Sequence, residues 1–345
     1  MKILYAALEF DKMNPLRGHS FEHNNFYDAL KRMRGVELIY FPYERAIHIG
    51  KRKMNEELLE TVQKEKPDLF FAFMYTDELD KKILGEIKKI TKSVAWFSDD
   101  HWRFDNYSKY YASHFSWVVT TYSKVIEKYK AIGISNIIRS QWAANTNIYK
   151  PFSGEKDIDV SFIGSWNKER EKIINVLKTA GIEVEVWGSG WKNGRINQTK
   201  LVELIGRSKI SLGLNPPSSY IGIKPMARLF FRRSGRLIVP DFWNFFKNLK
   251  EWQQKRIPQI KARHFEIPAC ASLLLTQDAD DLSRYYEFDK EIIIYENVSD
   301  LIRKVKYYLK HDKEREQIAQ LGLERTLSDH TYEKRFSEIF RIIKI

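Results

Sequence analysis

The feature that most constrains this chain is an alternation of short apolar runs with longer amphipathic stretches, which occurs twice. In the first half, strands are predicted at residues 2–7, 36–41, 68–74, 93–98 and 117–122, with helices at 20–33, 54–66 and 77–90. Strands that alternate with helices favour a parallel sheet covered by helices on both faces. The first half is therefore predicted to be a doubly wound α/β domain.

The pattern starts again after a polar seam at residues 147–157, which carries proline, glycine and charge. Beyond the seam, strands are predicted at 159–165, 184–190, 210–215 and 272–276, and helices at 168–181, 298–312 and 313–327. The last stretch has apolar residues at helical spacing, namely Tyr332, Phe336, Ile339, Phe340 and Ile343. We therefore predict an α/β chain with two Rossmann-like domains, residues 1–150 and 151–328, followed by a terminal helix over 329–345.

Composition narrows the class of protein further. A chain of 345 residues with 43% hydrophobic residues has the size of two folded domains. Its single cysteine, Cys270, forms no intramolecular disulfide, and the stretch after Lys2 is too short for a signal peptide, so we expect a cytoplasmic protein. The formal net charge of +13 favours an anionic partner.

Two candidate sites follow strands of the first half, where doubly wound sheets bind ligands. Gly18 and His19 lie in the loop after the first strand, and this pair is either part of a ligand site or a turn with a surface histidine. Asp99, Asp100 and His101 follow a later strand and are flanked by tryptophans. Because neighbouring side chains rarely converge on one ion, we expect acid–base work or hydrogen bonds to sugar hydroxyls rather than a metal. A helix N-cap is the alternative for the two aspartates.

Two further candidates lie in the second half. Gly164 ends a predicted strand, and Lys168 and Arg170 begin the next helix, which is an arrangement suited to a diphosphate. Arg263 and Glu266 are three residues apart, so they share a face if they begin a helix. They either pair with each other, or Arg263 faces a phosphate while Glu266 accepts from a ribose diol.

The stretches "KARHFEIPACASLLLT" and "YYEFDKEIIIYENVSDLIRKVKYYLKHDKEREQIAQLGLERTLSDHTYEKRF" resemble the C-terminal half of GT-B glycosyltransferases, specifically the CgeB-like (spore-maturation-type, group 1) branch. In the first half, "WFSDDH" and "SQWAANTNIYKP" are also similar. The resemblance implies two Rossmann-like domains that face a cleft, with the terminal helix crossing back to the first domain. It implies a retaining, metal-independent sugar transfer from a UDP- or GDP-linked donor to a glycan or lipid-linked acceptor, as in polysaccharide biosynthesis, without a cofactor.

The resemblance also assigns site residues. Glu266 matches the glutamate that contacts the nucleotide ribose, and Gly164 matches the glycine turn near the diphosphate. The expected acceptor-side and catalytic residues are His19, Asp99, Asp100 and His101. The expected donor-binding residues are Gly164, Ser165, Trp166, Lys168, Arg170, Gly188, Arg263, His264 and Glu266. The chain departs from the family at Ala271, where glycine is frequent, and at Pro258, where many retaining relatives carry a second glutamate.

Residues 220–257 have no counterpart in the family pattern. This basic-aromatic segment, expected within the second domain, holds nine basic side chains, two acidic ones and eight aromatic ones. It suggests peripheral contact with an anionic membrane surface or a lipid-linked acceptor, and no specific nucleic acid is expected. The alternatives are that the cations only line a solvent face, or that the chain is a non-catalytic protein that binds nucleic acid or a membrane surface.

Overall fold

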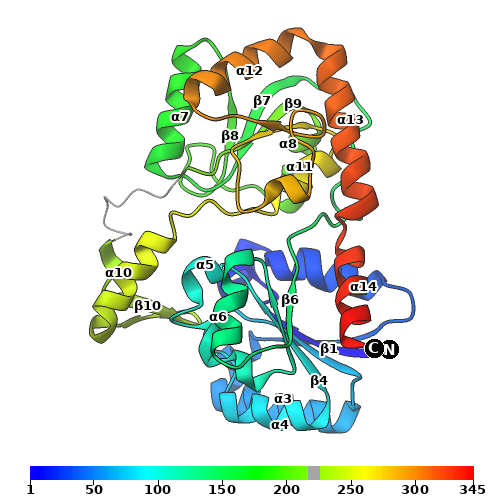
Figure 1. Ribbon diagram of the computed structural model, residues 1–345, viewed down its shortest axis with the longest axis vertical. Helices are drawn as coiled ribbons and strands as arrows, with labels where there is room; N and C mark the ends of the chain where they lie inside the picture. The colour runs from blue at the N-terminus through cyan, green and yellow to red at the C-terminus, as the bar shows by residue number, and fades with distance from the viewer. Residues whose placement is uncertain (217–225) are drawn as a thin grey trace. The chain divides into compact units, whose positions relative to one another are not determined.

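The structure, a computed structural model, describes residues 1–216 and 226–345 and divides into two compact units (Figure 1). The first unit comprises Met1–Gln141, Tyr332–Ile345 and the described residues of Tyr220–Lys255. The second comprises Arg256–Thr331 and the described residues of Trp142–Ser219. Each unit is built around one parallel sheet.

The sheet of the first unit has six strands in the order β2-β1-β3-β4-β5-β6, and all neighbouring pairs are parallel. Its strands are β1 (Lys2–Ala7), β2 (Glu37–Pro42), β3 (Leu69–Phe73), β4 (Lys92–Phe97), β5 (Trp117–Thr120) and β6 (Ile137–Arg139). The first five were predicted. The three-residue β6 was not, because it is too short to show a period.

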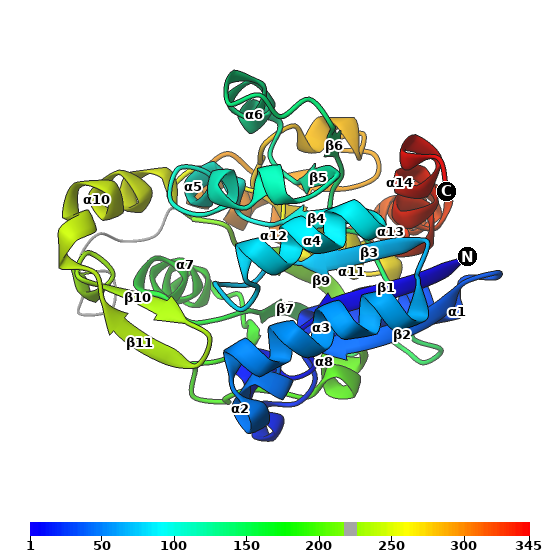
Figure 2. The ribbon, with the colours of Figure 1, turned by 90° about the horizontal axis from the view of Figure 1, so that it is seen from below.

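Helices cover both faces of this sheet. The connections contain a π-helical turn (His23–Tyr27), α1 (Asp28–Arg32), α2 (Arg45–Ile49), α3 (Lys51–Glu65), α4 (Lys81–Ile90), α5 (Asp100–Arg103) and α6 (Ile126–Ala131). On one face, α3 and α4 lie side by side (Figure 2), and Leu58 and Ile87 pack there against Leu4 and Phe70 of the strands. Tyr5 and Phe71, which follow Leu4 and Phe70 in their strands, point to the opposite face of the sheet, because successive side chains of a strand alternate between faces.

The terminal helix α14 (Tyr332–Ile343) packs on that opposite face of the first unit, the domain to which the resemblance implied that it crosses back. The ring of Phe26 lies 5.0 Å from Tyr332 and 5.3 Å from Phe336 between centroids. Lys92 Nζ donates to the carbonyl oxygen of Ile343 at 3.1 Å. The apolar stripe seen in the sequence therefore completes the core of the first unit.

The second unit has five parallel strands in the order β13-β12-β9-β7-β8. They are β7 (Ile158–Ile163), β8 (Glu185–Trp187), β9 (Ser208–Gly213), β12 (Leu273–Thr276) and β13 (Ile293–Ile294). The helices are α7 (Lys168–Thr179), α8 (Gln198–Gly206), α11 (Arg263–Ala269), α12 (Val298–Lys310) and α13 (Asp312–Asp329). Leucines of one strand alternate between the faces: Leu273 and Leu275 pack with α7 and α12, and Leu274 packs with α8 and α11.

The basic-aromatic segment belongs to the first unit, whereas the sequence led us to place it in the second domain. Its described part is an antiparallel hairpin of β10 (Phe231–Ser234) and β11 (Leu237–Pro240), followed by α10 (Phe245–Gln254). Ser234 Oγ donates to Asp77 at 2.7 Å, and Gly235 N donates to Thr76 Oγ1 at 3.0 Å. Lys250 pairs with Asp105 at 3.6 Å. These polar contacts join residues more than a hundred positions apart, so no local pattern revealed them.

Candidate functional site

Both sheets have a topological switch point, where consecutive crossovers leave in opposite directions. In the second unit it lies between β7 and β9, and in the first unit it lies between β1 and β3. Ligands of open parallel sheets bind beside such a point, at the carboxyl ends of the strands. Ligand-binding residues are therefore expected on the loops that follow β7, β9, β1 and β3.

Gly164 and Gly188 follow neighbouring strands of the second unit and approach each other closely. Gly164 N donates to the carbonyl oxygen of Trp187 at 2.9 Å, and Trp191 Nε1 donates to the Gly164 carbonyl at 2.9 Å. A Cβ atom at Gly188 would lie 2.0 Å from the Gly164 carbonyl oxygen, and Gly188 has φ of +139°. Only glycine fits this position, so two bare backbone loops lie together at the edge of the sheet.

Arg170 lies at the switch point itself. Its Nε donates to the carbonyl of Leu214 after β9 at 3.1 Å, and its Nη1 donates to the carbonyl of Ser165 after β7 at 2.7 Å. Its guanidinium also stacks over Phe162 at 5.4 Å. Burial lowers the pKa of Arg170. The predicted phosphate partner therefore uses two of its five N–H donors to join the loops on either side of the crevice.

The other predicted residues of this loop are accessible. Ser165, Trp166 and Lys168 are exposed, and Asn167 caps α7 by accepting from Arg170 N at 2.8 Å. Asn167 satisfies one main-chain donor of the first helical turn, and the remaining donors of that turn have no partner inside the helix. The N-terminus of α7 therefore lies beside the paired glycine loops with a lysine at its first position.

Arg263 and Glu266 form an ion pair on α11, which was one of the two outcomes left open by the sequence. Glu266 is 0% exposed, and its Oε1 accepts a hydrogen bond from the Tyr149 hydroxyl at 2.7 Å. Arg263 Nε reaches the carbonyl of Ile163, at the end of β7, at 3.5 Å. The pair therefore lies at the carboxyl edge of the sheet and is held there from two sides.

His264 is an internal residue. Its Nδ1 accepts from Lys261 N at 2.9 Å, and its Nε2 lies 3.2 Å from Thr276 Oγ1 at the end of β12. The Thr276 hydroxyl donates to the Gly213 carbonyl at 2.9 Å, so it is free to accept from His264 Nε2–H. Burial lowers the pKa of His264 to about 4. A neutral imidazole thus ties the start of α11 to the strands, and we read His264 as a positioning residue.

Asp100 was expected to do acid–base work or to bind sugar hydroxyls, and the structure places it in the interior of the first unit instead. The residue is 1% exposed, and three hydroxyls donate to its carboxylate, those of Ser108, Thr120 (2.6 Å) and Tyr129 (2.9 Å). Burial raises the pKa of Asp100 to about 6 although these hydrogen bonds oppose the shift. The carboxylate therefore holds the loop after β4 to β5 and α6.

Asp99 and His101 flank this anchor. Asp99 is partly exposed and has φ of +60°, a left-handed conformation that costs free energy outside glycine, while its side chain makes no N-cap hydrogen bond. His101 is 6% exposed, and its ring lies edge-on to Tyr122 at 5.9 Å. Beside them, Lys255 Nζ lies 3.6 Å from the centroid of the Trp102 ring. Burial lowers the pKa of Lys255 to about 8, while Glu251 opposes that shift.

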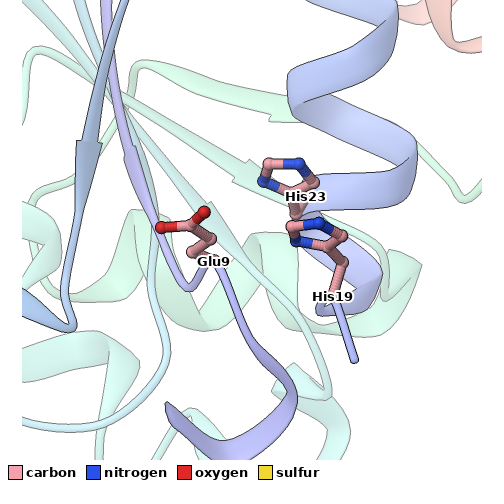
Figure 3. A group of neighbouring side chains, drawn as sticks. All are labelled: Glu9, His19 and His23. Atoms are coloured by element: carbon pink, nitrogen blue, oxygen red, sulfur yellow. The ribbon is translucent and has the colours of Figure 1, made fainter. Parts of the chain in front are cut away.

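His19 belongs to a stack of rings beside the loop after β1. It lies 5.1 Å from Phe10 and 4.0 Å from His23, nearly parallel to both. Glu9, His19 and His23 bring their ligand atoms within 4.8 Å of one another (Figure 3). The planes of the two imidazoles differ by only 10°. Their in-plane lone pairs therefore lie in two nearly parallel planes and do not meet, whereas two imidazoles that share an ion must aim their lone pairs at one point. This arrangement favours ring stacking over metal ligation.

Several residues of these sites were missed by reading the sequence. Tyr149 was included in a linker, although an aromatic residue before Pro151 in a polar stretch is a signal of burial. Thr276 and Gly213 were read only as strand residues, yet a Cβ atom at Gly213 would lie 2.6 Å from Thr276 Oγ1. The contact of Lys255 with Trp102 joins two distant segments and had no signal in the sequence.

Comparison with known proteins adds a family and a fold. Residues 168–341 match the model of a family described as glycosyl transferase-like. No curated protein sequence is significantly similar to the chain. Among solved structures, HepE of Anabaena in complex with UDP and glucose superposes with a TM-score of 0.61 at 11% identity, covering 100% of this chain and 99% of that one.

Two further structures are similar over their whole length. Sucrose-phosphate synthase of Thermosynechococcus elongatus has a TM-score of 0.61 at 10% identity, covering 99% of this chain and 98% of that one. A glycosyltransferase of Rickettsia africae has a TM-score of 0.57 at 11% identity, covering 99% and 97%. At such identities the likeness concerns the fold, which is that of GT-B glycosyltransferases with two Rossmann-like domains.

Proposed function

The chain belongs to the glycosyl transferase-like family, and we propose that it transfers a sugar from a nucleotide-sugar donor, held by the second unit, to a hydroxyl group of a glycan or lipid-linked acceptor. The observation that carries the proposal is the close approach of Gly164 and Gly188 beside the N-terminus of α7. The N-terminus of α7 presents main-chain N–H groups to an anion, the glycine loops beside it cause no steric hindrance, and the positive end of the helix dipole favours negative charge.

The diphosphate of the donor lies beside these loops in this proposal. Exposed Lys168 supplies a cation at the first position of α7, and Ser165 supplies a hydroxyl. Arg170 holds the loops after β7 and β9 in register, since it donates to a carbonyl of each, at Ser165 and Leu214. Because fixed donors that stabilise a leaving diphosphate need no ion, we propose that the transfer is metal-independent.

The nucleoside lies toward α11. Both oxygens of Glu266 already accept hydrogen bonds, from Tyr149 and Arg263. Each carboxylate oxygen has a further lone pair, so a ribose diol is an additional donor that Glu266 can accommodate. Arg263 pairs with the buried carboxylate of Glu266. The arginine and the tyrosine thus orient the glutamate, which makes the contact.

The acceptor and the sugar are assigned to the first unit, at the loops after β1 and β4. His19 is exposed beside the switch point, and Asp99 is partly exposed in a strained conformation. We assign proton transfer and sugar contacts to His19 and Asp99. We assign a positioning role to Asp100 and His101 because both are buried, Asp100 beneath three hydroxyls. The narrower assignment to the CgeB-like branch, with retention at the anomeric carbon, rests on the motifs around Glu266.

The donor is proposed to be a UDP-sugar, a choice that the UDP and UDP-glucose complexes of the structurally similar HepE support. Thermal-shift measurements with UDP, GDP and dTDP test this directly. A ligand at a hundred times its Kd stabilises the folded state by about 2.7 kcal/mol, so the matching nucleotide raises the melting temperature most.

Incubation with the corresponding nucleotide sugar then separates an enzyme from a binding protein. Release of the nucleoside diphosphate, with or without added acceptor, is the expected result, and the anomeric proton coupling of the product identifies retention. Stabilisation by none of the three nucleotides would contradict the donor site. Stabilisation without turnover of any matching nucleotide sugar would instead favour a non-catalytic member of the fold.

A further inference from the structure

The described part of the basic-aromatic segment, residues 226–255, exposes large apolar side chains. Trp243 is 98% exposed, Phe246 is 82% exposed and Ile238 is 69% exposed. Leu237, Phe242 and Met226 are also more than half exposed. A water-facing cluster of this kind marks a surface that meets a partner.

The outer face of the hairpin carries part of this cluster. Paired residues of an antiparallel hairpin share a face, and residues along one strand alternate between faces. Phe231, Arg233 and Ile238 therefore lie together, because Arg233 pairs with Ile238 and Phe231 lies two positions away from Arg233. Ser234 faces the other way and bonds Asp77 of the first unit. The unit anchors one face of the hairpin, and the opposite face is turned to solvent.

The start of α10 continues the same surface. Phe246, Lys247 and Lys250 are spaced by one and four residues in α10, so they lie on one side of the helix, and the exposed Trp243 lies in the short helical turn Phe242–Asn244 directly before it. Phe242 joins this side to the hairpin, since its ring lies 5.6 Å from Phe231. In Figure 2, α10 and the two strands of the hairpin occupy one end of the first unit.

The basic and acidic side chains of the segment lie on different sides of it. Arg233, Arg236, Lys247 and Lys250 are exposed beside the apolar residues. The two acidic residues are turned inward: the side chain of Asp241 is 12% exposed and that of Glu251 is 16% exposed. Asp241 accepts from Asn244, and Glu251 accepts from Asn106. The outer surface is therefore cationic and apolar at once.

We propose that this surface docks the protein on an anionic lipid bilayer, with Trp243, Phe246 and Ile238 inserted among the headgroups and Arg233, Arg236 and Lys247 on the lipid phosphates. Tryptophan has an apolar body with a polar edge and suits this interface. Cations beside inserted side chains gain from the negative potential of the leaflet. A nucleic acid would use aromatic faces for stacking, and it would leave the exposed aliphatic Ile238 without a role. Among the described residues, no helix is long and apolar enough to cross a membrane, so docking is peripheral.

The test is co-sedimentation of the full chain with vesicles, without nucleotide sugar, so that its outcome is independent of transfer activity. Vesicles with about one third phosphatidylglycerol in phosphatidylcholine are expected to bind the chain, and pure phosphatidylcholine vesicles are expected to bind it at least about tenfold more weakly. Binding weakens as salt rises, because the cations are exposed and screened. The tryptophan emission of the original protein is expected to shift to the blue on anionic vesicles. The part of the emission that comes from Trp243, which is the part missing in Trp243→Phe, is expected to carry this shift.

Two double variants separate insertion from charge. Trp243→Ser with Phe246→Ser removes apolar surface and keeps the charge, and Arg233→Glu with Lys247→Glu reverses two cations. Each is expected to weaken binding by about tenfold or more. The matched control is Lys306→Glu with Lys313→Glu, which makes the same change of net charge at two exposed lysines of the second unit and leaves binding within about twofold of the original.

Three outcomes would overturn the proposal. The first is a chain that stays in the supernatant with anionic vesicles at low salt. The second is equal loss in the control variant, which would mean that net charge alone attracts the protein. The third is normal vesicle binding by both double variants, which would move the contact elsewhere. Circular dichroism of each variant checks the fold, and because these side chains are exposed, their replacement leaves the core unchanged.

Discussion

The hydroxyl of Tyr149 donates a 2.7 Å hydrogen bond to Oε1 of Glu266, a fully buried carboxylate that also pairs with Arg263. We expect Glu266→Ala to weaken UDP binding by about 1.5–3 kcal/mol, the usual contribution of a charged hydrogen bond. Tyr149→Phe leaves the carboxylate and Arg263 in place, so it is expected to lower the free energy of unfolding by about 1 kcal/mol and to change UDP affinity less. Titration calorimetry and denaturant unfolding measure the two effects. Unchanged UDP affinity in folded Glu266→Ala would remove Glu266 from the donor site.

Gly188 is expected to be irreplaceable for donor binding. Its added Cβ would lie 2.0 Å from the Gly164 carbonyl, which is backbone, so Gly188→Ala must push the two loops apart. We expect UDP affinity to fall by about tenfold or more, because the helix N–H groups and the loops lose register. The control is Gly181→Ala, which has a left-handed φ of +78° and nothing within 4 Å. It costs about 1–2 kcal/mol of stability and leaves UDP affinity unchanged. Equal affinities in both variants would refute the role of the glycine pair.

Asp100 is expected to contribute to stability in a pH-dependent way. Burial raises its pKa to about 6 in the folded protein, above the ordinary value of 3.8, so the folded state binds the proton more tightly than the unfolded chain. The resulting stabilisation is complete below about pH 4 and is lost as pH rises through about 6. Asp100→Asn does not titrate at this position. Relative to that variant, the free energy of unfolding of the original protein should fall by on the order of 3 kcal/mol between about pH 4 and pH 7.

Denaturant unfolding of the two proteins from about pH 4 to pH 7 measures this difference, and a constant difference would contradict it. Asp100→Ala provides the comparison. It leaves the hydroxyls of Ser108, Thr120 and Tyr129 without their acceptor. Relative to Asp100→Asn, which likewise does not titrate, its free energy of unfolding is therefore expected to be lower by about 1–3 kcal/mol at every pH.

Ala271 has φ of +55°, in the left-handed region that favours glycine. The left-handed conformation destabilises the folded state by about 1–2 kcal/mol for alanine. Glycine avoids this cost, but its greater freedom in the unfolded chain lowers the free energy of unfolding by about 0.4–1 kcal/mol. We therefore expect Ala271→Gly to raise the free energy of unfolding by about 0.5–1 kcal/mol. Ala269→Gly, in the buried last turn of α11, is the matched control and should lower it by about 1–2 kcal/mol. Destabilisation by Ala271→Gly would show that the strain is relieved in some other way.

Sugar transfer is expected to continue in EDTA, since fixed cations and main-chain N–H groups stabilise the leaving diphosphate. Activity that EDTA abolishes and Mg²⁺ or Mn²⁺ restores would contradict this prediction. In that case Glu9, His19 and His23 are the first ligands to test, because rotation of the stacked imidazoles would bring their lone pairs together. Loss of metal binding in His23→Ala would then identify the site.

The chemistry of the candidate sites could be predicted only in part from the sequence. Gly164 and Lys168 were predicted as donor-binding residues because a glycine after a strand and a cation at a helix start are local features, and their role stays a prediction. Asp100 was misjudged, since adjacent carboxylates after a strand look the same in sequence whether they face solvent or three buried hydroxyls. Tyr149 was overlooked because its partner Glu266 lies 117 positions away in the chain.

The sequence by itself determined the two parallel sheets and the apolar stripe of α14, because the periods of strands and helices are set by backbone geometry within a few residues. Only the tertiary structure decided that residues 226–255 join the first unit, that Arg170 links β7 to β9, and that Gly188 must be glycine. Each of these depends on contacts between segments distant in the chain. Such contacts follow from the packing of whole elements, and the pattern within any one element carries no record of its partner.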